Sequence, residues 1–127
     1  EDLIDDDIIV DDDIVEIDEG KTEITFEDAI KPKEHIEVRT RFDKITRKIT
    51  IENKLNDEIT LTVDFKQTKD VTFVESIPQA TEVEEPNYKF KINIPSEETR
   101  RISLKLQEKI VKRVTKIKPE FIKKQKK

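Results

Sequence analysis

The stretch ITRKITIENKLNDEITLTVDF, residues 45–65, alternates apolar and polar side chains on both sides of a short polar segment. The apolar positions are Ile45, Ile49, Ile51, Ile59, Leu61, Val63 and Phe65. A period of two predicts strands with one face on a core and the other in water. Asn53, Asn56 and Asp57 tolerate the backbone of a tight turn, so the two runs are predicted to be connected antiparallel strands.

The same alternation continues on both sides of this stretch. It predicts strands at residues 36–42, 88–94 and 102–106, and further strands at 22–26 and 71–75. Pro78 and Pro86 place the longest loop at 76–87, because proline cannot donate to a strand ladder. About seven short strands predict an all-β fold, an immunoglobulin-like antiparallel β-sandwich. Its predicted core is Ile49, Ile51, Leu61, Val63, Phe65, Phe90, Ile92, Ile102 and Leu104.

Residues 107–122 fit two structures. Ile110, Val111, Val114, Ile117 and Phe121 match one face of a helix, whereas their β-branched content and their continuity with Leu106 match a long edge strand. We expect the strand, ending before Pro119. The chain then divides into an acidic segment at 1–19, which is an edge strand or a tail, a sandwich domain at 20–118 and a basic tail at 119–127.

Composition excludes several classes of function. The 127 residues correspond to one domain and include no Cys, so disulfides, thiolate metal sites and thiol nucleophiles are excluded. No apolar run is long enough to span a bilayer, and no signal-peptide pattern is present. A charged fraction of 43% with a single glycine is typical of a thermophile, and we expect an archaeal source. The first residue is Glu1, so we expect a piece of a longer protein, cytoplasmic or, alternatively, a cell-surface module.

The charges are sorted along the chain. Residues 1–37 carry a net charge of −13, residues 38–99 carry −2 and residues 100–127 carry +10. An acidic and a basic end on one small domain can attract each other within a molecule or between molecules.

The acidic segment contains two Asp triplets, 5–7 and 11–13, separated by Ile8, Ile9 and Val10 and followed by Ile14, Val15 and Ile17. Three interpretations are open. Carboxylate clusters suit Ca²⁺, although no glycine-bearing loop accompanies them. The apolar residues Ile8, Ile9, Val10, Ile14, Val15 and Ile17 can form a strand, guarded by like charges, that adds to a sheet edge. The third interpretation is a solvated acidic tail. We expect the strand, with the Lys109–Lys116 segment as its neighbour.

The basic residues form a candidate patch: Lys109, Lys112, Arg113, Lys116, Lys118, Lys123 and Lys124. Such a run can contact phosphates of a nucleic acid or an anionic membrane. Only Phe121 is near for base stacking, and the net charge of −5 opposes a polyanion. A solvated face, or a partner for the acidic segment, is the alternative that we favour.

No catalytic constellation is present. His35 is the only histidine and falls on the outward phase of a predicted strand, with no nucleophile or paired carboxylate at a recognisable spacing. No glycine-rich phosphate loop occurs. We therefore expect no enzyme activity, no cofactor and no small-molecule substrate.

Residues 45–114 resemble a known family. The segments that carry the similarity are KITIENKL at 48–55, ITLTV at 59–63, FKINIPSEE at 90–98 and ISL at 102–104. They resemble the C-terminal sandwich domain of the mucoidy-inhibitor-A-like family. The resemblance implies an interaction module. We therefore expect a non-catalytic structural or protein-interaction module, part of a larger protein or assembly, that joins itself or another protein through edge strands.

Overall fold

The computed structural model describes residues 7–122. It contains eight strands and a single turn of 3-10 helix: β1 (Ile8–Asp18), β2 (Glu23–Asp28), β3 (Glu34–Asn53), β4 (Ile59–Lys66), β5 (Val71–Ile77), β6 (Glu82–Glu84), β7 (Asn87–Ile94), β8 (Thr99–Ile117) and η1 (Pro119–Phe121). All strand pairs are antiparallel.

The strands form two sheets. Sheet A has the order β1-β3-β8-β5, with β2 also paired to β3, and sheet B has the order β4-β7-β6. The inward residues of the two sheets make one apolar core, in which Phe90, Ile94, Ile51, Ile102 and Leu104 are almost completely buried. The predicted all-β sandwich is confirmed. The predicted core is buried except that Leu61, Val63 and Ile92 are only partly so.

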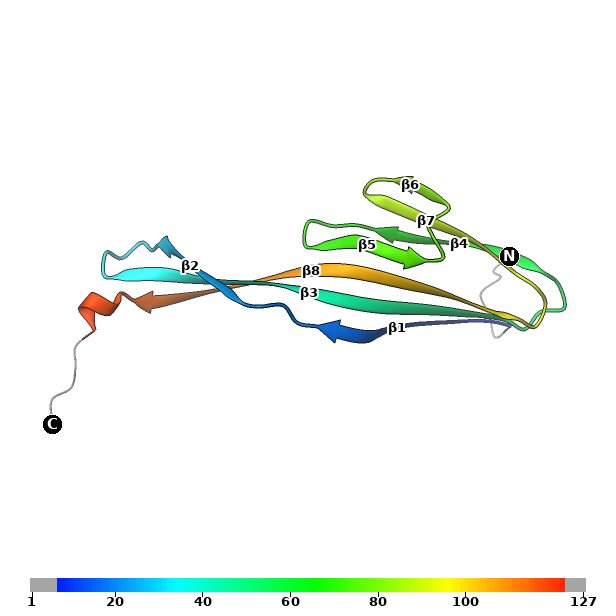
Figure 1. Ribbon diagram of the computed structural model, residues 1–127, viewed down its shortest axis with the longest axis horizontal. Coiled ribbons are helices and arrows are strands. Elements are labelled where there is room, and N and C mark those ends of the chain that lie inside the picture. The colour runs from blue at the N-terminus through cyan, green and yellow to red at the C-terminus, as the bar shows by residue number, and fades with distance from the viewer. Residues whose placement is uncertain (1–6, 123–127) are drawn as a thin grey trace, which may run out of the picture.

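Sheet A is much longer than sheet B. Sheet B covers one half of β3 and β8, where β5 also pairs with the edge of β8, and β2, β3 and β8 continue beyond this half as a three-stranded projection (Figure 1). We call this projection the arm and define it as β2, residues 34–43 of β3 and residues 108–117 of β8. The covered part of the molecule is the sandwich half.

Strand β3 joins the two halves without a break. The sequence predicts separate strands at 36–42 and 45–51, but both belong to one strand of 20 residues with an uninterrupted register against β8. The apolar positions change from even to odd numbers between Phe42 and Ile45. Alternate residues point to opposite faces, so Ile36, Val38 and Phe42 lie on the face of sheet A that is opposite to the core. The prediction that they share the core face is wrong.

Strand β8 resolves the ambiguity at residues 107–122. It extends to Ile117, directly before Lys118 and Pro119, so the predicted strand is confirmed and the helical alternative is wrong. It is not an edge strand along its whole length. Residues 103–108 are paired with β5 on one side, while β3 pairs with residues 99–117 on the other.

The acidic segment forms a strand, but its neighbour differs from the predicted one. β1 pairs with residues 44–53 of β3 and not with Lys109–Lys116, because β3 lies between the acidic strands and β8. The connection from β1 to β2 passes close to the β3 backbone at Gly20. A Cβ atom there would lie 2.1 Å from the Phe42 carbonyl oxygen, so this position requires glycine. The Gly20 N–H donates to Asp43 Oδ1 at 3.2 Å.

Candidate functional site: the open edge of the arm

The backbone of β8 offers unpaired hydrogen-bonding groups along the arm. In an antiparallel ladder, successive residues point their N–H and C=O groups alternately to the two sides. The Lys118 N–H donates to the Lys33 carbonyl at 2.8 Å, and the Asn53 N–H donates to the Glu98 carbonyl at 2.9 Å. Even-numbered residues of β8 therefore bond to β3. The Lys109 N–H donates to the Asp70 carbonyl at 2.7 Å, on the other side.

Beyond Lys109 no strand within residues 7–122 lies on that other side. β5 pairs with β8 only over residues 103–108, so no described strand faces the outward groups of Val111, Arg113, Thr115 and Ile117. All four residues are exposed. We call their outward N–H and C=O groups the open edge. An exposed row of such groups is a template for pairing with another strand.

The charges near the open edge are partly neutralised by the arm itself. Lys116 Nζ lies 3.2 Å from Glu37, and Arg113 Nε lies 3.6 Å from Glu27. Lys109 and Lys112 are exposed and make no ion pair within residues 7–122. The predicted basic patch thus contains two neutralised cations, Arg113 and Lys116, and two unneutralised ones, Lys109 and Lys112, all on β8, and Lys118 directly follows the strand. Lys123 and Lys124 lie outside the described residues.

Ion pairs also connect neighbouring residues and strands of the arm. Glu37 is buried on the middle strand and accepts a hydrogen bond from Arg39 Nε. This bond, aided by Lys116, holds the pKa of the Glu37 carboxyl below its usual value. Arg41 contacts Asp43 at 3.0 Å and Glu19 at 3.4 Å, which connects β3 to the end of β1.

The arm also exposes apolar side chains on both faces. Phe42 is 46% exposed and Ile117 54%, whereas Ile24 and Phe26 of β2 are exposed on the opposite face. Phe26 packs against the His35 ring at 4.5 Å between centroids. Of these residues only Ile117 lies on β8, beside the open edge, whereas Ile24 and Phe26 lie on the other side of β3. His35 is half-buried, and its ring contacts Phe26.

The opposite edge of sheet A is acidic. β1 and β2 lie in line along β3, and the residues of both strands are exposed except Ile8 and Ile9. Of the predicted partner-strand residues, Ile8 is buried in the core and Ile9 is half-buried, whereas Val10, Ile14, Val15 and Ile17 are exposed. Within residues 7–122 no cluster of three potential ligands could hold a metal ion, and Asp5 and Asp6 lie outside that range. Nothing described therefore supports calcium binding by the triplets.

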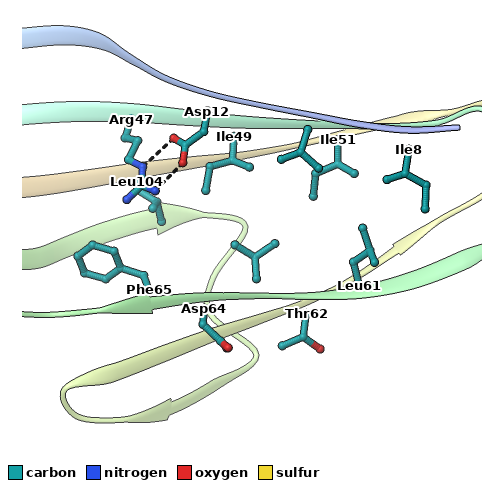
Figure 2. A pocket seen from close by; sticks show the side chains of 12 residues that line it. Ile8, Asp12, Arg47, Ile49, Ile51, Leu61, Thr62, Asp64, Phe65 and Leu104 are labelled. Atoms are coloured by element: carbon teal, nitrogen blue, oxygen red, sulfur yellow. Dashed lines mark hydrogen bonds and ion pairs between the residues drawn. The ribbon is translucent and has the colours of Figure 1, made fainter. Parts of the chain in front are cut away.

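A separate apolar groove of about 320 Å³ lies between β1 and β4. Ile8, Ile49 and Ile51 line it from sheet A and Leu61 and Phe65 from sheet B, whereas Thr62 and Asp64 point away from the gap (Figure 2). At one end Arg47 donates to both carboxylate oxygens of Asp12, at 2.7 and 2.5 Å. This groove is the open side of the sandwich, and its polar groups are already paired with each other.

The Asp12–Arg47 pair predicts a small dependence of stability on pH. The hydrogen bond from Arg47 lowers the pKa of Asp12. The pair therefore stabilises the fold above the ordinary aspartate pKa of about 3.9, and this contribution is lost as pH falls through the lowered value. Because both side chains are about one-third exposed, solvent screening keeps the effect below about 1 kcal/mol.

We expect Asp12→Asn to lower the free energy of unfolding in urea at pH 7, and the loss to shrink as pH falls below the ordinary aspartate pKa of about 3.9. Asp11→Asn is the matched control, because Asp11 is exposed and makes no ion pair within the described part of the chain. Equal losses for the two variants at pH 7 would contradict the role of the pair.

Comparison with protein families, with characterised proteins and with solved structures finds no match to this chain. Within the described residues no helix is long and apolar enough to cross a membrane. Sequence reasoning identified the basic strand and the acidic strand, but not the open edge, because the side of β8 that stays unpaired depends on where β5 ends.

Proposed function

We propose that the chain is a non-catalytic structural module, built on an immunoglobulin-like sandwich, that joins protein partners by accepting an extended strand at the open edge of the arm. The observation that carries this proposal is the difference between the two parts of β8. Residues 103–108 have strands on both sides, whereas residues 111–117 have, among the strands of residues 7–122, one on the β3 side alone.

The chemistry of the edge indicates an acidic extended partner. Main-chain hydrogen bonds supply affinity in strand addition, and the flanking side chains supply specificity. β8 carries Lys109, Lys112, Arg113 and Lys116 over residues 109–117 with no acidic residue. Opposite charges across paired strands contribute roughly 0.2–1 kcal/mol per pair, so an acidic strand is favoured over a basic one.

A synthetic peptide tests this proposal. We expect a capped peptide that alternates glutamate with threonine and valine to bind the protein and to slow amide hydrogen exchange at Val111, Arg113, Thr115 and Ile117. A peptide with lysine in place of each glutamate is the control for charge. Thr115→Pro is the matched protein control, because it removes one outward N–H and leaves the bonds from β8 to β3 intact.

Two results would overturn the proposal. The first is binding of the peptide that leaves exchange at these four amides unchanged. The second is an absence of peptide binding together with binding of duplex DNA whose affinity falls steeply with salt, because that behaviour indicates counterion release from phosphates.

A further inference from the structure

We infer that the strand accepted at the open edge is β2 of a second copy of this chain, so that the arms of successive copies join head to tail. This inference rests on the proposed function and identifies its partner. It follows from three properties of the arm: the direction of the outward backbone groups, the charge of its two edges and the position of β5.

The backbone groups of the two edges match. Odd-numbered residues of β3 bond to β8, so its even-numbered residues bond to β2 through the register Thr40↔Glu23, Val38↔Thr25 and Ile36↔Glu27. The intervening residues Ile24, Phe26 and Asp28 therefore point their N–H and C=O groups outward. No described strand lies on that side of β2. β2 therefore has three outward positions spaced two residues apart, and the open edge has four positions with the same spacing.

The charges of the two edges are complementary. β2 carries Glu23, Glu27 and Asp28 without a basic residue, and residues 109–117 of β8 carry four basic residues and no acidic one. Glu27 is already paired with Arg113 of the same chain and Lys116 with Glu37, so the charges that remain unpaired within residues 7–122 are Glu23 and Asp28 on β2 and Lys109 and Lys112 on β8. Pairing of β8 with the β8 of another copy would bring like charges together, and so would pairing of β2 with β2. Like charges directly opposite each other destabilise a strand pair, so unlike edges are selected.

The position of β5 determines the relative direction of the copies. β1 lies in line with β2 along β3, and β5 occupies the side of β8 at residues 103–108. A second copy whose β2 ran parallel to β8 would place its β1 on the position of β5. The reversed direction carries the β1 and the sandwich half of that copy past the end of the arm (Figure 1). The added strand is therefore antiparallel to β8.

This contact joins two different surfaces. After the first contact one copy keeps a free β2 edge and the other keeps a free open edge, so the interface is heterologous and propagates into a chain of copies. The side chains that meet are exposed, so screening by salt weakens the contact.

Amide exchange in the unmodified protein tests the inference. In a dilute sample at about 0.1 M salt, where the Debye length is about 10 Å, we expect fast exchange at Val111, Arg113, Thr115 and Ile117 and slow exchange at Lys112 and Val114. In a concentrated sample the outward amides, together with Ile24, Phe26 and Asp28, become protected. The average mass in sedimentation equilibrium rises above the 15.0 kDa of one chain. About 1 M salt, with a Debye length of about 3 Å, reverses both changes.

Two proline variants identify the edges. Thr115→Pro blocks the open edge and Ile24→Pro blocks β2, so each alone is expected to be monomeric. An equimolar mixture should give a dimer that grows no further, because only one edge of each variant is intact. Thr115→Val keeps the N–H and should assemble like the unmodified protein. If either proline variant fails to fold, Lys109→Glu/Lys112→Glu replaces Thr115→Pro and Glu23→Lys/Asp28→Lys replaces Ile24→Pro, each expected to be monomeric alone at low salt.

The outcomes separate this inference from the proposed function. A mass of one chain at all concentrations, with the acidic peptide still protecting the open edge, overturns the second copy as partner and leaves strand addition standing. Dimers of Ile24→Pro alone indicate pairing between two β8 edges and also overturn the inference. An absence of both self-assembly and peptide binding overturns both proposals.

Discussion

Replacement of Phe90 by alanine is expected to lower the free energy of unfolding by about 3–5 kcal/mol. Phe90 lies on β7 and has no exposed surface. It belongs to the cluster that contains Ile51 and Ile102 of sheet A, so its loss leaves a cavity between the two sheets. Small domains are stable by only about 5–15 kcal/mol in total, and this variant is therefore expected to lose a large part of that stability.

Phe42→Ala is the matched control for Phe90→Ala. The same side-chain atoms are removed, but Phe42 is half-exposed on the arm, so its truncation leaves no enclosed cavity and is expected to cost less than half as much. Denaturation in guanidinium with both fluorescence and circular dichroism measures the two effects. Equal losses would contradict the assignment of the core to the space between sheets A and B.

Asn53→Ala is expected to have the next largest effect. Asn53 has no exposed surface, and its Nδ2 donates to the carbonyl oxygens of Asp57, Ile94 and Pro95 at 2.9, 3.0 and 3.2 Å. Its Oδ1 accepts a hydrogen bond from the Leu55 N–H at 2.9 Å. One side chain therefore fastens the turn between β3 and β4 to the end of β7.

The cost of Asn53→Ala comes from the partners that it leaves behind. A buried polar group without a hydrogen bond costs roughly 1–3 kcal/mol, and at least the Ile94 carbonyl and the Leu55 N–H lose theirs, so we expect a loss of about 2–5 kcal/mol. Asn56→Ala, in the same turn but exposed, is the matched control and should change stability by less than about 0.5 kcal/mol. Similar melting temperatures for the two variants would show that the buried bonds contribute little.

The alternation of apolar residues was sufficient to predict most of the strands and the core. Ile49, Ile51, Phe65, Phe90, Ile102 and Leu104 were predicted to be inside and are buried. Alternation works here because each of these strands has one face on the core and the other in water, which is the condition under which a period of two is visible. The end of β8 before Pro119 followed from the missing N–H of proline.

The change of phase between Phe42 and Ile45 was visible in the sequence but was misinterpreted. The two residues between the apolar runs, Asp43 and Lys44, are neither glycine nor proline. The absence of a turn signal there could have indicated one continuous strand. The apolar face of residues 36–42 was assigned to the core because alternation reports which residues share a face, and not which face of the sheet is covered.

The sequence by itself determined the strand pattern, the apolar positions of the sandwich half and the separation of acidic from basic residues. Only the tertiary structure decided that β3 lies between the acidic strands and β8, and that sheet B covers half of sheet A. It also decided that β5 pairs with β8 only over residues 103–108, which leaves Val111 and the residues after it without a neighbour among the described strands on that side. The physical reason is that strand pairing uses main-chain groups that are the same in every residue, so neighbours depend on the packing of the whole chain. The open edge is a product of that packing.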